Sequence, residues 1–168
     1  MTILVVGATG ATGVRLVEEL LNRGQNVKVI VRSPENLPDT IKSHERLSTI
    51  TASVLDLSDE EMAQHVSGCD AVASCLGHNI TFKGMFCKPR RLVTDATRRL
   101  CNAIKANKFE KPAKYVLMNT VANRNRDLNE PNPFIQKVVF SLLRLFLPPH
   151  PDNEQAAEYL RTVIGQKD

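Results

Sequence analysis

Apolar residues along the chain follow two alternating periods. Short, mostly apolar runs of five to eight residues predict strands, and the continuous apolar run at 2–6 is typical of a strand buried on both faces of a parallel sheet. The predicted strands cover residues 2–6, 26–31, 47–54, 70–76 and 114–119. Between them, apolar residues recur at helical spacing. Strands that alternate with helices predict βαβ units, and therefore an α/β, doubly wound parallel sheet of Rossmann type with strand order near 3-2-1-4-5.

The first two helical segments have clear ends. The first begins near Gly10, has its apolar face on one side, and stops before Gly24, which is suited to the position after a helix. Its apolar face consists of Val14, Val17, Leu20 and Leu21. A second helix is predicted after Ser58, because Glu61 three residues later completes a capping box.

The rest of the chain contains three more helical segments. Residues 88–107 place Val93, Ala96, Leu100, Ala103 and Ile104 on one face. Residues 134–147 form an unusually apolar segment, predicted to be a helix. A proline-rich break at 148–151 precedes a final helix that is expected to start near Asp152. Residues 33–45 are expected to form a loop or short helix, and residues 121–133 a polar loop.

Composition places the chain among ordinary globular proteins. It has 168 residues, 42% hydrophobic and 24% charged, which predicts a single domain over 1–168. No apolar run reaches the roughly 20 residues that span a bilayer, and no targeting segment is recognised, so a cytoplasmic protein is expected. The net charge is +4, but the basic residues form no continuous stripe, which argues against nucleic-acid binding. The four cysteines have no metal-ligand spacing, so no metal site is expected.

The segment GATGATG at 7–13 carries the strongest functional signal. It lies between the first strand and the first helix, where a glycine-rich turn binds the pyrophosphate of a dinucleotide. Gly7 permits the turn, Gly10 lets the phosphates approach the backbone, and Gly13 lets the helix pack on the sheet. Free amides at the helix start favour the anion. The predicted pyrophosphate site consists of Gly7, Thr9, Gly10, Ala11, Thr12 and Gly13.

The end of the second strand indicates which dinucleotide is bound. A carboxylate there would hydrogen-bond the ribose hydroxyls of NAD, whereas an arginine accommodates the 2′-phosphate of NADP. The chain has Arg32 followed by Ser33 at this point. NADP(H) is therefore expected in preference to NAD(H).

Together these segments resemble the atypical short-chain dehydrogenase/reductase group, in particular the NAD(P)H-binding proteins of the biliverdin reductase B, flavin reductase and NmrA-like type. The resemblance covers nearly the whole chain, through VVGATGATG, VIVRSPENL, SVLDLSD, CDAVASCLG and KYVLMNT. It implies that Asp56, with Leu57, contacts the adenine amino group. It also implies that Leu76 and Gly77 pass close to the nicotinamide ribose.

The chain departs from this group in two ways. The catalytic Tyr-x-x-x-Lys pair is missing, because Tyr115 is followed four residues later by Asn119, and Tyr159 by Val163. Asn119 and Thr120 replace a frequent serine pair; with His78, they are weak catalytic candidates. Members of the group also continue into a sixth strand and a C-terminal substrate segment, so a fragment, a truncated form or an unusually short member is expected.

Two functions remain open. The first is an NADPH-dependent reductase that passes hydride to a small planar acceptor such as a flavin, quinone or tetrapyrrole. The alternative is a non-catalytic NADP(H)-binding sensor of NmrA-like type. The basic segment 77–91 is either a lip for an acidic ligand or a solvated loop. The 134–147 helix is a pocket roof, a homodimer or partner face, or an in-plane membrane helix without stable insertion.

Overall fold

The structure is a computed structural model that describes residues 1–78, 90–107, 111, 113–119 and 149–165. The chain forms two compact units. The first contains Met1–Leu76 and Ala96–Met118, and the second contains Gly77–Asp95 and Asn119–Asp168.

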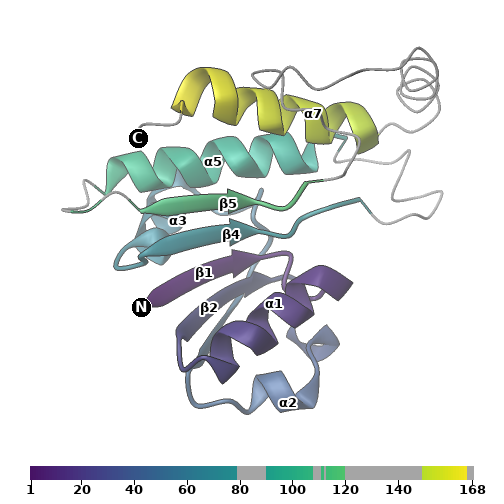
Figure 1. Ribbon diagram of the computed structural model, residues 1–168, viewed down its shortest axis with the longest axis vertical. Helices are drawn as coiled ribbons and strands as arrows, with labels where there is room; N and C mark the ends of the chain where they lie inside the picture. Colours follow the sequence, from purple (N-terminus) through teal and green to yellow (C-terminus); the bar gives the residue numbers. More distant parts are fainter. Residues whose placement is uncertain (79–89, 108–110, 112, 120–148, 166–168) are drawn as a thin grey trace. The chain divides into compact units, whose positions relative to one another are not determined.

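The first unit is built on a five-stranded parallel sheet (Figure 1). The strands are β1 (Thr2–Val6), β2 (Asn26–Val31), β3 (Leu47–Thr51), β4 (Ala71–Ser74) and β5 (Lys114–Leu117). Their order is β3-β2-β1-β4-β5, which confirms the predicted Rossmann-type sheet. The last three predicted strands are shorter than expected at their carboxyl ends, because the chain turns there into loops that carry the candidate site residues.

The central strand β1 pairs with β2 on one side and with β4 on the other. Val5 lies opposite Val29 of β2 and opposite Ala73 of β4. Side chains alternate between the two faces of the sheet, so Ile3 and Val5 enter one core cluster while Leu4 and Val6 enter the other. A run that is apolar at every position is therefore required by burial on both faces.

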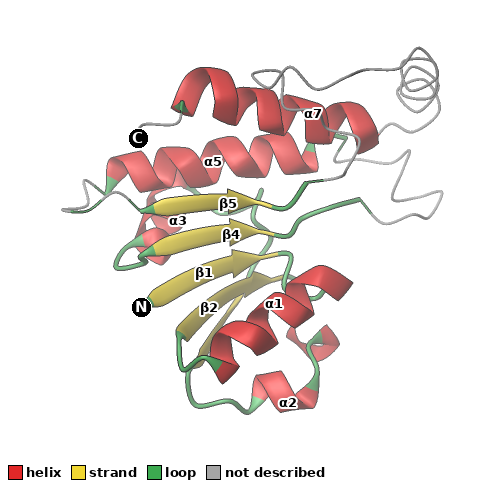
Figure 2. Ribbon diagram, viewed as in Figure 1, coloured by secondary structure: helices red, strands yellow, loops and turns green. Residues whose placement is uncertain are grey.

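Helices cover both faces of this sheet (Figure 2). One cluster is closed by α1 (Ala11–Asn22), by Leu37 directly after the 3₁₀ turn η1 (Pro34–Asn36), and by the short α2 (Asp39–Lys42). The other is closed by α3 (Asp59–Val66) and by the part of α5 (Leu92–Ala106) that belongs to this unit. The predicted apolar face of α5 is largely confirmed, since Ala96, Leu100 and Ala103 are buried.

The predicted helix ends are also observed. Ser58 Oγ accepts a hydrogen bond from the Glu61 amide at 3.1 Å, and Glu61 Oε2 accepts one from the Ser58 amide at 2.7 Å. This is the expected capping box of α3. Gly24 follows the last turn of α1 with φ +71°, the left-handed conformation that favours glycine after a helix.

The second unit contains α7 (Pro149–Tyr159), which continues into the π-helical turn η2 (Leu160–Ile164). The expected start near Asp152 is wrong by three residues. Prolines are tolerated in the first helical turn, where an amide has no partner within the helix, so Pro149 begins the helix instead of preceding it. The predicted segments 121–133 and 134–147 lie outside the described residues.

Candidate functional site

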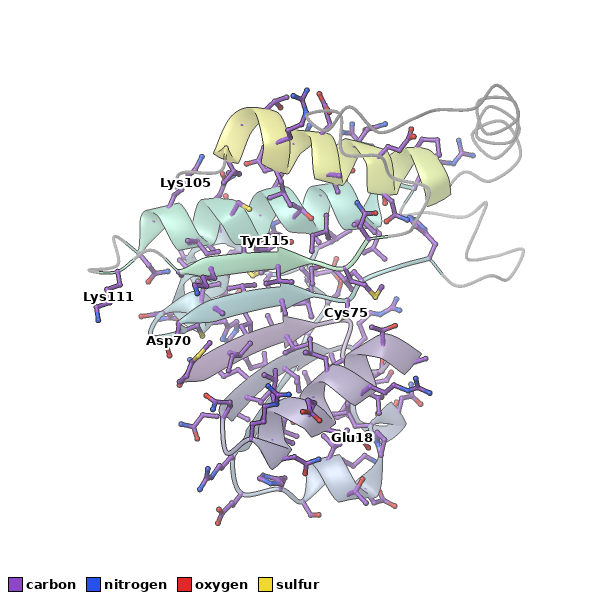
Figure 3. The ribbon with its side chains drawn as sticks, viewed as in Figure 1. Glu18, Asp70, Cys75, Lys105, Lys111 and Tyr115 are labelled. Atoms are coloured by element: carbon purple, nitrogen blue, oxygen red, sulfur yellow. The ribbon has the colours of Figure 1, made fainter. Side chains whose placement is uncertain are left out.

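The three glycines of the turn after β1 have different structural roles. Gly7 has φ +76°, and a Cβ there would lie 2.5 Å from the main-chain carbonyl of Cys75, at the carboxyl end of β4 (Figure 3). A Cβ on Gly13 would overlap the Gly7 carbonyl oxygen and lie 2.9 Å from Ala8 Cα. The nearest atom to a Cβ on Gly10 is the Gly7 oxygen at 3.4 Å. Packing therefore requires glycine at 7 and 13, but not at 10.

Among the described residues, no side chain caps the N-terminus of α1. Gly10 is the N-cap residue and provides no side-chain cap, and the first turn contains no acidic residue. The amides of Ala11, Thr12 and Gly13 precede the first complete turn, so they have no intrahelical acceptor. Their N–H groups and the helix dipole favour a negative charge. By contrast, α3 has a capping box and three acidic residues in its first turn.

A cavity lies beside this turn. It has a volume of about 270 Å³ and is lined by Thr9, Arg32, Ser33 and Asn36. Thr9 follows β1 and Arg32 follows β2, and the carboxyl ends of adjacent parallel strands meet at one edge of the sheet. The structure thus brings together three of the predicted cofactor residues. Asn36 was not anticipated, because it reaches the cavity only through the 3₁₀ turn η1.

The loop after β3 holds the next pair of predicted residues. Asp56 is exposed, whereas Leu57 is half-buried against the core cluster beneath α3 and α5. The amides of Asp56 and Leu57 both donate to the Ser53 carbonyl, at 3.0 and 3.3 Å. The loop is therefore a closed turn that leaves the Asp56 side chain at the surface.

Arg99 of α5 binds this loop from the core side, and the sequence reasoning missed it. Its guanidinium donates to the carbonyl oxygens of Val54 at 3.0 Å, of Leu55 at 2.6 Å and of Leu57. The side chain is only 21% exposed, and Asp59 lies 3.4 Å away. One planar cation thus binds three carbonyls within four residues, a geometry that the guanidinium fork provides and a lysine does not.

The remaining predicted residues follow β4 and β5. In the first unit, Leu76 is half-buried against the core. Gly77 is exposed, and a Cβ there would meet nothing within 4 Å among the residues that the structure describes. Asn119 is exposed directly after β5. Thr120 lies outside the described residues, as does most of the basic segment 77–91.

His78 is a member of a buried cluster in the second unit. Its Nε2 lies 2.8 Å from Asp152 Oδ2, and the two side chains are 5% and 1% exposed. The amides of Val93 and Thr94, in the first turn of α5, donate to the same carboxylate at 2.8 and 3.0 Å. Thr94 Oγ1 also donates to the Asp152 carbonyl at 2.9 Å. Asp152 therefore caps α5 from a different helix, a role the sequence spacing did not show.

The electrostatics of Asp152 follow from these contacts. Burial alone would raise the pKa of the carboxyl group, but hydrogen bonds from His78, Thr94 and the Val93 amide outweigh it and hold the pKa below its usual value. The carboxylate form is consequently the stable one in the folded protein. A histidine held by a carboxylate in this way has a fixed ring orientation, which is a requirement for proton transfer at a defined atom.

Two other groups of residues have structural roles. Tyr115 lies in β5, as predicted, and its hydroxyl contacts Thr97 Oγ1 at 3.1 Å (Figure 3). Burial raises the pKa of the Cys69, Cys75 and Cys101 thiols, for Cys101 to about 11, so these thiols are poor nucleophiles. Within the described ranges, no set of three or more His, Cys, Asp and Glu side chains is placed to hold a metal ion.

Comparison with known proteins agrees with this geometry. Residues 7–163 match the model of a family described as NAD(P)H-binding. The chain belongs to this NAD(P)H-binding family, as the resemblance implied. Among the helices that the structure describes, none combines the length and the apolar character needed to cross a bilayer.

Individual relatives match this chain either over a short segment or with low sequence identity. An uncharacterized chloroplastic protein of Arabidopsis thaliana is 41% identical over 58 residues, which is 34% of this chain and 21% of that protein. A Lactobacillus casei protein of known structure matches 98% of this chain and 69% of its own, with TM-score 0.73 and 20% identity. A Veillonella parvula short-chain dehydrogenase/reductase solved with NADP matches 96% and 64%, with TM-score 0.68 and 16% identity. The matched segment thus spans about a fifth of the curated relative, and the solved structures share the fold.

Proposed function

We propose that the chain binds NADPH and passes its hydride to a small planar acceptor of the flavin, quinone or tetrapyrrole kind. The observation that carries the proposal is the uncapped start of α1 directly after a turn in which Gly10 is not needed for packing. Such an end is suited to a pyrophosphate, because three amides are available and no Cβ blocks the approach.

The preference for NADPH rests on the cavity beside the turn. Arg32 lines it together with Thr9, Ser33 and Asn36, and none of these four lining residues carries a carboxylate that would repel a 2′-phosphate. A guanidinium binds phosphate through paired hydrogen bonds. We therefore assign Arg32 and Ser33 to the 2′-phosphate and Thr9 to the adjoining diphosphate.

The remaining contacts follow from the family resemblance. Asp56 is assigned to the adenine amino group, and Leu76 and Gly77 to the nicotinamide ribose. When bound, the nicotinamide supplies the hydride, so this chain's residues need only bind, orient and exclude water. Asn119, Thr120 and His78 are the candidates for contacting the acceptor. We expect this activity in the cytoplasm.

Binding measurements with both cofactors test the assignment of Arg32. We expect NADPH to bind at least about tenfold more tightly than NADH, the factor that one lost charge-assisted hydrogen bond produces. Arg32→Gln should remove this preference by weakening NADPH alone. Arg23→Gln is the matched control, because Arg23 is an exposed arginine at the other end of α1, paired with Glu19. Equal affinities in the wild type, or a parallel loss for both cofactors in Arg32→Gln, would refute the preference.

The second candidate function is a sensor that binds NADP(H) without turnover. It is favoured by the missing Tyr-x-x-x-Lys pair and by Tyr115, whose hydroxyl contacts Thr97. The two functions separate when NADPH oxidation is followed at 340 nm with a panel of flavins and quinones. Steady oxidation above the rate without protein supports the reductase, and tight binding without turnover supports the sensor.

A further inference from the structure

We propose that Arg99 is the positioning residue for the adenine end of the cofactor. It acts through the loop 54–57, whose shape it fixes, and so determines whether Asp56 can recognise the adenine amino group. This inference rests on the proposed function, since it takes the assignment of Asp56 from there. It adds a residue on α5 that is remote in sequence from every cofactor motif.

The contacts of Arg99 surround Asp56 on both sides. The carbonyl oxygens of Leu55 and Leu57 each accept a hydrogen bond from the guanidinium, and the Val54 carbonyl oxygen accepts a third. The Asp56 carbonyl is not among these partners, and the Asp56 side chain remains exposed. The guanidinium thus holds the backbone next to Asp56 without occupying the carboxylate.

The loop is held on the sheet by its own apolar side chains and by Arg99. Its amides at 56 and 57 converge on the Ser53 carbonyl, which closes the turn but does not fix its orientation on the sheet. The side chains of Val54, Leu55 and Leu57 pack in the core cluster, while the charge-assisted bonds to Arg99 hold the main-chain carbonyls of the same three residues. Without the cation, three carbonyls in a partly buried position would lose their donors, and the loop would turn them toward water.

The position of the loop links it to the dinucleotide site. It follows β3, which pairs with β2, and β2 pairs with β1. All three strands are parallel, so the loop, Arg32 and the glycine turn lie along the same edge of the sheet. A dinucleotide bound at the turn, with its 2′-phosphate at Arg32, therefore places its adenine on the β3 side of that edge.

A cofactor analogue separates this role from a merely structural one. Reduced nicotinamide hypoxanthine dinucleotide phosphate differs from NADPH in its base, which has a carbonyl where adenine has an amino group. We expect the wild type to bind NADPH about tenfold more tightly than this analogue, the factor for one hydrogen bond. Asp56→Ala should reduce the ratio to about one. Arg99→Met should do the same, and in the Asp56→Ala background it should not change the ratio further.

Controls make each outcome decisive. Arg98→Met removes an exposed arginine from the adjacent position of α5 and should keep the wild-type ratio. If Arg99→Met does not fold, Arg99→Lys and Arg99→Gln replace it. Both should lower the ratio, because lysine lacks the planar fork of the guanidinium and the glutamine amide has only two N–H donors. A wild-type ratio in any folded Arg99 variant would overturn the inference, as would a wild type that does not distinguish the two cofactors. A wild type that binds neither cofactor would instead overturn the proposed function itself.

Discussion

Substitution of alanine for individual glycines in the turn separates ligand binding from folding. Gly10 has φ −78° and ψ 159°, which alanine adopts freely, and its Cβ would make only an ordinary contact at 3.4 Å. Alanine is a poorer N-cap than glycine by about 0.5–1 kcal/mol, and it recovers about 0.4–1 kcal/mol by restricting the unfolded chain. Gly10→Ala should therefore fold with a stability within about 1 kcal/mol of the wild type.

The same substitution should severely reduce cofactor binding. The methyl group would occupy the space through which the pyrophosphate reaches the amides of α1. Loss of one or two charge-assisted hydrogen bonds, at about 1.5–3 kcal/mol each, weakens NADPH by at least about tenfold. Gly13→Ala should instead destabilise the fold, because its Cβ would overlap main-chain atoms of Gly7 and Ala8. It should be destabilised by about 1–3 kcal/mol or more.

The assay combines urea unfolding, followed by circular dichroism at 222 nm, with titration of NADPH fluorescence. The chain contains no tryptophan, so protein fluorescence interferes little with the cofactor signal. A Gly10→Ala protein that binds NADPH as tightly as the wild type would refute the assignment of the turn. A Gly13→Ala protein of wild-type stability would contradict the geometry of the turn itself.

Three further predictions concern stability. Asp152→Asn should lower the free energy of unfolding by about 2 kcal/mol at pH 7, through weakened contacts with His78 and α5. Because the folded pKa of Asp152 lies below 3.8, its contribution to the free energy of unfolding is present above about pH 4 and is lost as the pH falls through the folded pKa. In urea melts from pH 2 to 6, the Asp152→Asn protein should therefore lose less stability toward low pH than the wild type. An equal loss in both proteins would contradict the assignment. The folded Cys101 thiol has a pKa of about 11, against the ordinary value of 9.0 for an unburied cysteine. Its contribution to the free energy of unfolding is therefore constant below pH 9 and falls by at most about 3 kcal/mol up to pH 11. Cys101→Ala should reduce this loss of stability at alkaline pH, and the same loss as in the wild type would count against the burial argument. Ser58→Ala should lower stability by about 1 kcal/mol and Ser58→Asp by much less, measured by the same melts; equal losses would show that capping is not the cause.

Much of the fold could be predicted because its signals are local. An apolar run such as residues 2–6 indicates burial on both faces, and Ser58 with Glu61 specifies a helix start within four residues. The glycine turn was predictable for the same reason, since its three glycines and the flanking strand and helix are contiguous. The start of α7 was misplaced because the prolines were taken to exclude a helix, whereas the first turn tolerates them.

Two contacts that the sequence does not predict join distant segments, whereas Asn36 reaches the cavity locally through η1. Arg99 is 42 to 45 residues from the carbonyls it binds, and Asp152 is 58 to 59 residues from the amides it caps. Neither residue belongs to a motif, because an arginine on a helix face and an aspartate near a helix start are common. Only the fold shows that Asp152 is buried, that Arg99 is partly buried, and that both bind main-chain groups of distant segments.

The uncapped start of α1 also has a practical consequence for work on this protein. Sulfate, inorganic phosphate and pyrophosphate are small anions of the kind that such a helix end attracts, and each would compete with a dinucleotide for the same amides. Thermal stability should then rise with the concentration of these salts in the absence of any nucleotide, and apparent cofactor affinities should fall in phosphate buffer. Purification and titration in chloride-based amine buffers avoid this competition.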